Sequence, residues 1–310
     1  MIHRSGTITR DDLHGPIDWV YFVDALVAGH QCAQAKVEDV FLGAEGRTLL
    51  SRAAWIEGLG FGVKSVTAMA QNAARGLPTV QGVMLLFDDQ TGQVKAAIDG
   101  ALVTDIKTAS DSVLAARYLA RPDSKTHLVI GAGSVAENTI RAYRQNFHGI
   151  ETTLIWNRTA EKARLLADML CADGIPVSVV SELREAAAKA DIITAATMSA
   201  TPVLKGDWVQ PGAHVDLVGA FRADMREADD ALLQKARIFV DSRETTLAHI
   251  GELKMPLASG TITEADVLAD HYQLVAGFEG RSDPQDITVF KNGGGAHLDL
   301  MIADSILRQL

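Results

Sequence analysis

The sequence has two cysteines, no excess of positive charge and no metal-binding motif, and each absence excludes a class of protein. Cys32 and Cys171 lie far apart among 310 residues, so we expect neither a disulfide framework nor a thiolate zinc site. A net charge of −10 leaves no basic surface for nucleic acid or for an acidic membrane. The nine histidines lack spacings such as H-E-x-x-H, so the sequence predicts no metal.

Long apolar runs are also absent. No stretch approaches the roughly 18 uninterrupted apolar residues that can span a bilayer. The opening residues, MIHRSGTITRDD, contain no apolar segment that could serve as a secretory signal. Because 47% of the residues are hydrophobic, the chain can bury a sizeable core in one large or two ordinary domains. We therefore expect a cytoplasmic protein.

The first part of the chain is rich in strand patterns. Short β-rich segments at 62–70, 80–87 and 94–98 are separated by turn sequences such as DDQTG. Apolar residues then recur at helical spacing over 110–119, and RPDS at 121–124 indicates a hinge. A mixed α+β domain is therefore expected before residue 124.

The rest of the chain changes rhythm, because apolar strands alternate with helical stretches such as 160–169 and 181–189. This alternation indicates a parallel sheet with helices on both faces, the Rossmann arrangement. Residues 287–296, ITVFKNGGGA, precede an apolar helix that we expect to pack on the first domain. The sequence thus predicts an α/β fold with an α+β domain formed by 1–123 and 287–310 and a dinucleotide-binding domain at 124–286. The strands of the second domain are expected at 127–130, 152–156, 177–180, 191–196, 214–218 and 238–240.

Residues 128–136, LVIGAGSVA, have the features of a phosphate-binding turn. Gly131 and Gly133 directly follow a predicted strand and precede a predicted helix at 136–147. Gly131 permits the tight turn, and Gly133 lets the backbone approach a pyrophosphate at the helix N-terminus. Ala136 occupies the third small position, where helix and strand pack closely. We expect a dinucleotide to bind at this turn.

The end of the next strand carries no carboxylate. An Asp or Glu there would bind the ribose 2′-hydroxyl of NAD and repel a 2′-phosphate. The chain has Asn157, Arg158 and Thr159 instead. Asn and Thr can donate hydrogen bonds to phosphate oxygens, and the guanidinium adds positive charge. The sequence therefore favours NADP(H), with NAD(H) as the alternative.

Together with further motifs, these features make the chain resemble the ornithine cyclodeaminase/mu-crystallin family. The resemblance covers roughly residues 45–310, and it is specific because the motifs occur jointly and in order. They are GVKSVT at 62–67, GLPTV at 76–80, DGALVTDIKTA at 99–109, GAG at 131–133, IWNRT at 155–159, VGA at 218–220 with Arg226-Glu227, and VFK at 289–291.

The resemblance implies a homodimer whose chains each have a Rossmann domain and a discontinuous domain for substrate binding and dimerisation. Family members include ornithine cyclodeaminases, reductases of ketimines and of pyrroline-2-carboxylate, and some alanine dehydrogenases. Their shared chemistry is hydride exchange between a nicotinamide and the α-carbon of an amino or imino acid. A small imino or amino acid is therefore the expected partner.

The resemblance places Lys64 at the family's active-site lysine, near the reacting carbon and the substrate carboxylate. An ammonium group there can neutralise the carboxylate and, if burial lowers its pKa, can deliver a proton. Arg52 is expected to supply a second contact to the carboxylate, with Arg47 as the alternative.

Two positions depart from the family pattern. Lys107 stands where the family usually has a carboxylate-clamping arginine, so the charge is kept but the planar fork is lost. Phe221 stands where cyclodeaminases carry an aspartate, and a phenyl ring cannot exchange a proton. Asp224 lies nearby, but its spacing differs. Phe221 would also make the substrate pocket more apolar, which suits the methylene groups of a small ring.

Several other positions are candidates for the site. His297 and Asp299 are interpreted either as a proton relay or as residues that accept backbone hydrogen bonds at a helix start. Asp216 is interpreted either as a residue of the ligand edge or as a structural one. The cofactor contacts that the turn, the next strand end and the resemblance imply are Thr79, Lys107, Thr108, Gly131, Gly133, Ser134, Val135, Ala136, Asn157, Arg158, Thr159, Thr197, Met198, Val218, Gly219, Ala220, Lys291 and Asn292.

We therefore expect an NADP(H)-preferring reductase that converts Δ1-pyrroline-2-carboxylate to L-proline, or Δ1-piperideine-2-carboxylate to L-pipecolate. Arg52, Lys64 and Lys107 would hold the substrate carboxylate. One alternative is an ornithine cyclodeaminase, which releases ammonia and uses catalytic NAD. Two others are an alanine dehydrogenase-like enzyme and an NADPH-binding protein without turnover.

Overall fold

The computed structural model describes residues 6–310, and the chain divides into two compact units. Met1–Lys107 and Gly295–Leu310 form unit 1, and Thr108–Gly294 forms unit 2. The boundary falls inside one helix, α2 (Gly100–Leu119). Within the described range, every helix is too short or too polar to cross a bilayer.

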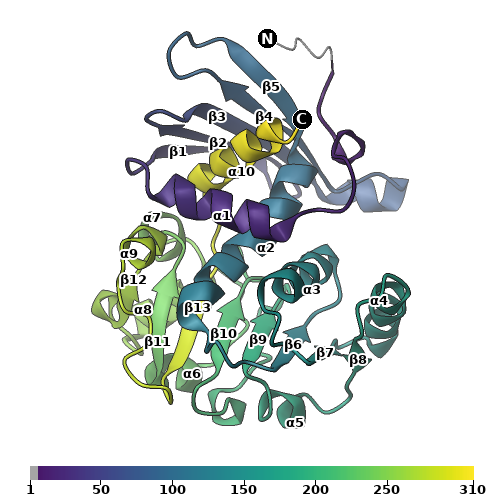
Figure 1. Ribbon diagram of the computed structural model, residues 1–310, viewed down its shortest axis with the longest axis vertical. Helices are drawn as coiled ribbons and strands as arrows, with labels where there is room; N and C mark the ends of the chain where they lie inside the picture. The colour runs from purple at the N-terminus through teal and green to yellow at the C-terminus, as the bar shows by residue number, and fades with distance from the viewer. Residues whose placement is uncertain (1–5) are drawn as a thin grey trace. The chain divides into compact units, whose positions relative to one another are not determined.

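Unit 1 contains a five-stranded antiparallel sheet in the order β1-β2-β3-β4-β5 (Figure 1). Buried and less buried residues alternate along its central strands, so one face of the sheet packs on a core. The last helix, α10, lies against β2 and β3 on that face, which confirms the expectation that it returns to the first domain. The elements of unit 1 are η1 (Arg10–Asp12), α1 (Trp19–His30), β1 (Lys36–Ala44), β2 (Arg47–Ile56), β3 (Gly60–Met69), η2 (Ala70–Arg75), β4 (Val80–Phe87), β5 (Val94–Asp99) and α10 (Ala296–Arg308).

The packing of α10 on the sheet leaves no room for a side chain at Gly62. A Cβ atom there would lie 2.5 Å from Met84 Cε and 3.1 Å from Leu300 Cδ1. Because side chains alternate along a strand, Lys64 on β3 lies on the same face as Gly62. Arg52 on β2 is the cross-strand partner of Lys64 and shares that face.

Unit 2 contains an eight-stranded sheet, in the order β12-β11-β13-β10-β9-β6-β7-β8, whose strand pairs are all parallel. The chain runs outward from β6 to β8 and then resumes on the other side of β6 at β9. Ligands bind outside the carboxyl ends of the strands at such a reversal. The strands are β6 (Thr126–Ile130), β7 (Thr152–Trp156), β8 (Ser178–Val179), β9 (Ile192–Ala195), β10 (His214–Leu217), β11 (Ala236–Val240), β12 (Val267–Ala269) and β13 (Ile287–Lys291).

The helices of unit 2 alternate with these strands, which confirms the predicted α/β class. The first of them, α3, begins directly after Gly133, two residues earlier than predicted. They are α3 (Ser134–Asn146), α4 (Ala160–Ala172), α5 (Leu183–Ala187), η3 (Gly206–Trp208), α6 (Asp230–Lys235), α7 (Arg243–Thr246), α8 (Gly251–Ser259), η4 (Glu264–Asp266) and α9 (His271–Val275).

The limits of the two units differ from the predicted domain limits. We placed residues 287–310 together in the first domain, but β13 pairs with β10 and β11 in the parallel sheet. All five of its residues are buried, as in other central parallel strands. Residues 108–123 also belong to unit 2, because α2 starts at Gly100 rather than at residue 110 and continues across the boundary.

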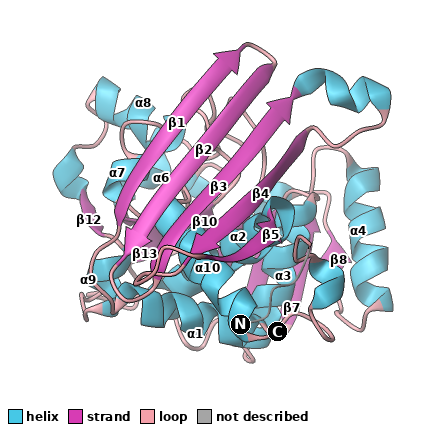
Figure 2. Ribbon diagram, turned by 90° about the horizontal axis from the view of Figure 1, so that it is seen from above, coloured by secondary structure: helices cyan, strands magenta, loops and turns pink. Residues whose placement is uncertain are grey.

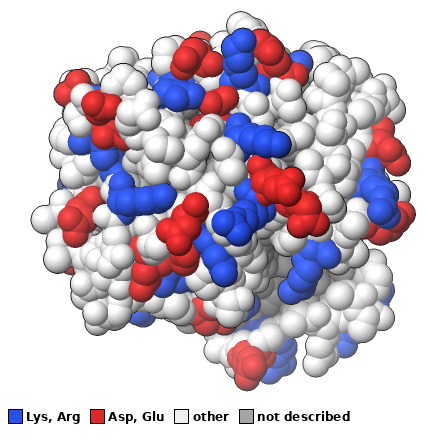
Figure 3. All heavy atoms as spheres, turned by 90° about the horizontal axis from the view of Figure 1, so that it is seen from below, with Lys and Arg blue, Asp and Glu red and all other residues white. Residues whose placement is uncertain are grey.

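Figure 3 shows one face of the molecule, on which Lys and Arg side chains are interspersed with Asp and Glu. No continuous basic patch covers this face, in keeping with the net charge of −10. A surface of this kind does not attract a polyanion by long-range electrostatics.

Candidate active site

In unit 1 the sheet and the last helix together hold a buried ion pair. Lys64, on β3, donates a hydrogen bond of 2.6 Å from Nζ to Asp299 Oδ1 on α10. The same amine lies 3.3 Å from the hydroxyl of Thr104, which is exposed on α2. Both members of the ion pair are almost completely buried. The ammonium group therefore lies just beneath the surface in a fixed position.

The charges around Lys64 make this an anion-binding environment. Burial lowers the pKa of Lys64, Asp299 raises it, and the neighbouring cations Lys107 and Arg52 lower it. Three cations thus act on a region in which Asp299 is the carboxylate that contacts Lys64. A substrate carboxylate would supply a further negative charge.

The two candidate arginines of β2 lie in different surroundings. Arg52 faces Lys64 across the ladder and donates from Nε and Nη2 to the carboxylate of Asp39, at 2.9 to 3.1 Å. Arg47 is exposed and pairs with Met69 at the far end of the strand. The structure therefore brings Arg52, and not Arg47, to the lysine.

Lys107 is buried in unit 1 and differs from Lys64 in its surroundings. Within residues 6–310 its side chain makes no hydrogen bond or ion pair. Its Nζ atom is not among the buried polar atoms without a partner, so the ammonium group remains accessible and a bound anion can reach it.

In unit 2 the turn after β6 has the expected geometry. Gly131 has φ +132°, and a Cβ atom there would lie 2.5 Å from the carbonyl oxygen of Ala196. Gly133 has open space around it, and α3 begins at the next residue, Ser134. Ala136 is fully buried against the sheet. The turn therefore leaves room for a diphosphate at the helix N-terminus, and its residues fit one.

The end of β7 presents a cation without a protein partner. Arg158 is exposed and forms no hydrogen bond or ion pair with any described residue. Asn157 donates from Nδ2 to the carbonyl oxygen of Thr159 at 2.9 Å, which shapes the turn into α4. The three residues thus follow the strand end at which a carboxylate would bind the 2′-hydroxyl in NAD-binding sheets.

The loops after β9 and β10 contain a further group of the expected cofactor contacts. Thr197 follows β9, and Val218, Gly219 and Ala220 follow β10. The carboxylate of Glu227, a buried residue, accepts hydrogen bonds from both loops. In the sequence this residue was noted only as part of the Arg226-Glu227 motif. Met198 is 75% exposed and free to contact a ligand.

Two of the residues expected to contact the cofactor, Lys291 and Asn292, have buried side chains. Lys291 is fully buried, and its amine donates to the carbonyl oxygen of Leu217 at 2.7 Å. Asn292 donates from Nδ2 to the carbonyl oxygen of Thr108 and to Ser112, each at 3.0 Å. The Lys291 amine is enclosed among buried carboxylates, and the cofactor contacts expected of Lys291 and Asn292 stay predictions.

Three further residues are placed as follows. Phe221 is 57% exposed, and the guanidinium of Arg222 lies 5.9 Å from the centre of its ring. Asp224 binds the same guanidinium, at 2.9 Å from Nε, so it does not replace the missing aspartate. Thr79 lies in the exposed turn before β4, where its carbonyl oxygen accepts from Met69.

Among the residues with open interpretations, Asp299 lies nearest the lysine. Its partner is 235 positions away in the sequence, so the local sequence signalled the pair only through the presence of polar residues among the apolar ones of the last helix. Asp216 is fully buried and accepts from Ser112 at 3.1 Å, and burial raises its pKa to about 7. These contacts favour a structural role for Asp216.

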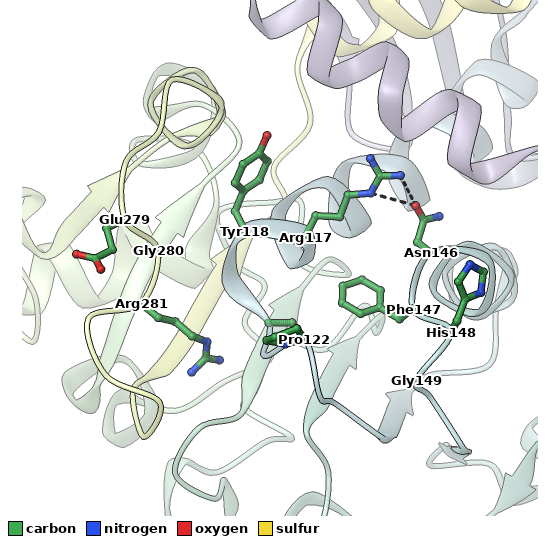
Figure 4. Close-up of a pocket in the computed structure, with 11 residues that line it drawn as sticks. Arg117, Tyr118, Pro122, Asn146, Phe147, His148, Gly149, Glu279, Gly280 and Arg281 are labelled. Atoms are coloured by element: carbon green, nitrogen blue, oxygen red, sulfur yellow. Dashed lines mark hydrogen bonds between the residues drawn. The ribbon is translucent and has the colours of Figure 1, made fainter.

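A separate cavity of about 580 Å³ lies in unit 2, at the C-terminal ends of α2 and α3. Figure 4 shows its lining, including the bonds from Arg117 to Asn146 and the side chains of Tyr118, Phe147 and Arg281. None of the expected site residues lines it. The cavity is therefore distinct from the dinucleotide turn.

The chain is similar in sequence and in fold to several known proteins. Residues 42–309 match the model of the ornithine cyclodeaminase/mu-crystallin family. The Δ1-pyrroline-2-carboxylate reductase of Paracoccus denitrificans is 54% identical over 97% of this chain and 96% of its own length. A Thermococcus litoralis enzyme of the same name, solved with NADH and L-proline, superposes with a TM-score of 0.90 at 31% identity, covering 98% of this chain and 96% of that chain. An archaeal alanine dehydrogenase dimer with bound NAD also superposes at 0.90, with 29% identity over 98% of this chain and 95% of that one.

Proposed function

The chain belongs to the ornithine cyclodeaminase/mu-crystallin family, and from this premise we propose that it reduces a small cyclic imino acid with NAD(P)H. The substrate is Δ1-pyrroline-2-carboxylate, which gives L-proline, or its six-membered homologue, which gives L-pipecolate. The observation that carries the proposal is the buried pair of Lys64 and Asp299 with Arg52 and Lys107 beside it. This group offers the two things that an imino acid needs, a carboxylate site and a proton donor.

Reduction of a C=N bond needs one hydride and one proton. A bound reduced nicotinamide would supply the hydride for the new C–H bond at C2 and would itself be oxidised. The π electrons of the C=N bond move to nitrogen, which takes a proton from the Lys64 ammonium or from a bound water molecule. Asp299 holds that ammonium through its bond of 2.6 Å and so limits the directions in which the proton can be donated.

The substrate carboxylate is assigned to the cations of unit 1. Lys107 has an accessible ammonium group without a partner among the described residues, and a carboxylate can pair with it. Arg52 already binds Asp39, so its contribution is a second contact from the guanidinium together with its charge. Because Lys107 lacks the planar fork of arginine, the carboxylate is held by point charges rather than by a bidentate clamp.

Phe221 favours a reductase over a cyclodeaminase. Cyclisation of ornithine with loss of ammonia needs proton transfers at two substrate nitrogens, and a phenyl ring can perform none of them. The nearby Asp224 is bound to Arg222 and stays at the surface. Reduction of a preformed cyclic imine does not need an acid at this position.

For the dinucleotide, we assign a preference for NADPH. The solved relatives described above hold NADH and NAD. In this chain the end of β7 has no carboxylate to repel a 2′-phosphate, and the free guanidinium of Arg158 can pair with one. Asn157 and Thr159 add hydrogen-bond donors beside it.

A homodimer is supported by the face of the unit 1 sheet that points away from α10. In Figure 2 strands β1 to β4 are seen without a helix in front of them. Val40, Leu42 and Phe61 are 51%, 59% and 43% exposed on the face opposite Gly62. An apolar surface of this kind is typical of an interface, and a second copy of the chain is the assigned occupant.

Two assays on the purified protein test the activity. The first follows the absorbance of NADPH and of NADH with Δ1-pyrroline-2-carboxylate, and the second measures ammonia from L-ornithine with NAD. We expect oxidation of the reduced dinucleotide in the first assay and no ammonia in the second. Release of ammonia from ornithine, or tight NADPH binding without turnover of any cyclic imine, would contradict the proposal.

A further inference from the structure

One buried carboxylate joins the two loops that follow β9 and β10. Glu227 Oε1 accepts the backbone N–H of Thr197 at 2.6 Å and its hydroxyl at 2.8 Å. Glu227 Oε2 accepts the backbone N–H of Gly219 at 2.6 Å and that of Ala220 at 3.1 Å. Each carboxylate oxygen therefore serves one loop, and four donors end on a single side chain.

The joined loops are packed so closely that backbone meets backbone. A Cβ atom on Gly219 would lie 2.0 Å from the carbonyl oxygen of Thr197. On the other side, a Cβ atom on Gly131 would meet the carbonyl oxygen of Ala196, the residue before Thr197. The phosphate turn, the β9 loop and the β10 loop thus lie in direct succession along the carboxyl edge of the sheet.

Glu227 is itself held from two sides. Its own N–H and that of Ala228 donate to the carboxylate of Glu252, at 2.7 and 3.0 Å. Its carbonyl oxygen accepts from Val203 and Leu204. Burial raises the pKa of Glu227 to about 8, whereas the ammonium of Lys291 and the hydrogen bonds from Thr197 lower it and favour the carboxylate form that four donors require. The residue is fully buried, so it cannot touch a ligand.

The position of these loops along the sheet indicates which part of a dinucleotide they meet. The turn after β6 would hold the diphosphate of a bound dinucleotide, and Arg158 at the end of β7 would hold the adenosine end. A dinucleotide that crosses the strand reversal then has its nicotinamide half over β9 and β10. The loops tied by Glu227 follow these two strands.

We propose that Glu227 is a positioning residue for the nicotinamide half of the dinucleotide, because it fixes the spacing between the loops after β9 and β10. The proposal rests on the proposed function, since it assumes that a dinucleotide binds at this edge. Glu227→Gln is the sharpest change. An amide has one oxygen acceptor, so it can serve one loop only, and its NH₂ group faces the donors of the other.

Asp191 offers a matched control at the amino edge of the same sheet. Its carboxylate likewise ties separate segments together, because Oδ2 accepts from the backbone N–H groups of Lys125 and Thr126 and Oδ1 accepts from the guanidinium of Arg121. Asp191→Asn therefore removes a similar bridge far from the carboxyl edge. Glu227→Asp is the second variant, because it keeps the charge opposite Lys291 but is too short to reach both loops.

The experiment measures the dissociation constants of NADPH and NADH by calorimetry on the full chain, with urea unfolding of each variant. We expect both Glu227 variants to bind NADPH at least about 10-fold more weakly than the wild type, with Asp191→Asn within about twofold of it. In steady-state assays the KM for the dinucleotide should rise more than the KM for the imine.

The outcomes separate the two proposals. If both Glu227 variants bind NADPH as tightly as the wild type does, the positioning role is overturned and the proposed function is not. A loss of affinity equal to that of Asp191→Asn would also overturn it, because general loss of stability would then explain the effect. Absence of dinucleotide binding by the wild type would overturn the proposed function and the positioning role together.

Discussion

The pKa of the Lys64 amine depends on burial and on the charged side chains around it. Burial lowers its pKa and Asp299 raises it, so the pKa of the amine depends on one contact of 2.6 Å. The matched pair on the same helix, Asp304 with Lys95, is more exposed and lies outside the cation cluster. The effect of Asp299 on the pKa of Lys64 can therefore be tested against a control substitution of Asp304 in the same helix.

Replacing Asp299 with Asn should move the alkaline limb of kcat/KM to lower pH. The active form of Lys64 is protonated, and loss of the opposing charge lowers its pKa, so activity is lost earlier as pH rises. A shift of about one unit or more is expected from a contact at this distance. The pH profile of imine reduction measures it. Asp304→Asn should leave the limb in place, and an unshifted limb in Asp299→Asn would contradict the role of the pair.

Replacing Arg158 with Ala should change the choice of dinucleotide. Loss of a charged contact to the 2′-phosphate should lower the ratio of kcat/KM for NADPH to that for NADH by roughly 10-fold. Lys162, exposed in α4, provides the control for a general effect of positive charge. If Lys162→Ala lowers the ratio as much, the guanidinium of Arg158 has no specific contact with the phosphate.

At the scale of an element, the turn between β6 and α3 contains two glycines with opposite constraints. Gly131 adopts a positive φ and abuts the backbone of Ala196, whereas Gly133 has an ordinary φ and open space. The first glycine is therefore needed by the fold, and the second by a ligand.

Alanine at each of these glycines should separate folding from binding. Gly131→Ala should lower the free energy of unfolding by about 1–3 kcal/mol, because the strained backbone and the contact with Ala196 are both imposed in the free protein. Gly133→Ala should leave stability nearly unchanged and weaken dinucleotide binding. Urea unfolding and calorimetry measure the two effects. Equal loss of stability in both variants would show that the space at Gly133 is not reserved for a ligand.

The elements that the sequence predicts well are those whose burial leaves a clear pattern of apolar residues. Strands β6 and β7 were predicted to within one residue, because continuous apolar runs between turns identify buried parallel strands. β1 was not predicted, since it is exposed on both faces and shows no alternation. α1 was also missed. The phosphate turn followed from local glycine spacing, whereas Asp299 and Glu227 act through contacts that only the folded chain brings together.

At the scale of the whole molecule, the open face of the unit 1 sheet is the proposed dimer interface. Its apolar side chains come from several strands, and Trp55 stacks with Phe61 at 6.0 Å between ring centres. A sheet face of this composition exposed to water in a monomer would be unfavourable. Assembly with a second copy would cover it.

Changing Leu42 to Asp should convert the dimer to a monomer. A carboxylate on the proposed interface would have to be desolvated in each copy, which strongly opposes association. Light scattering coupled to size-exclusion chromatography measures the mass. Leu165→Asp is the control, because Leu165 is 61% exposed on α4 of unit 2 and matches the 59% exposure of Leu42. A wild-type monomer, or a Leu42→Asp dimer, would contradict this interface.

The lack of contacts between the Arg158 guanidinium and other described residues affects how the cofactor preference of such enzymes can change. No described residue relies on its guanidinium, so a replacement there leaves the contacts of the fold as they were. The loops tied by Glu227 allow no such freedom, because a change at Gly219 also displaces Thr197. If Arg158 sets the proposed preference for NADPH, selection or engineering can exchange one reductant for the other by a single surface substitution, while the loops proposed to hold the nicotinamide stay constant.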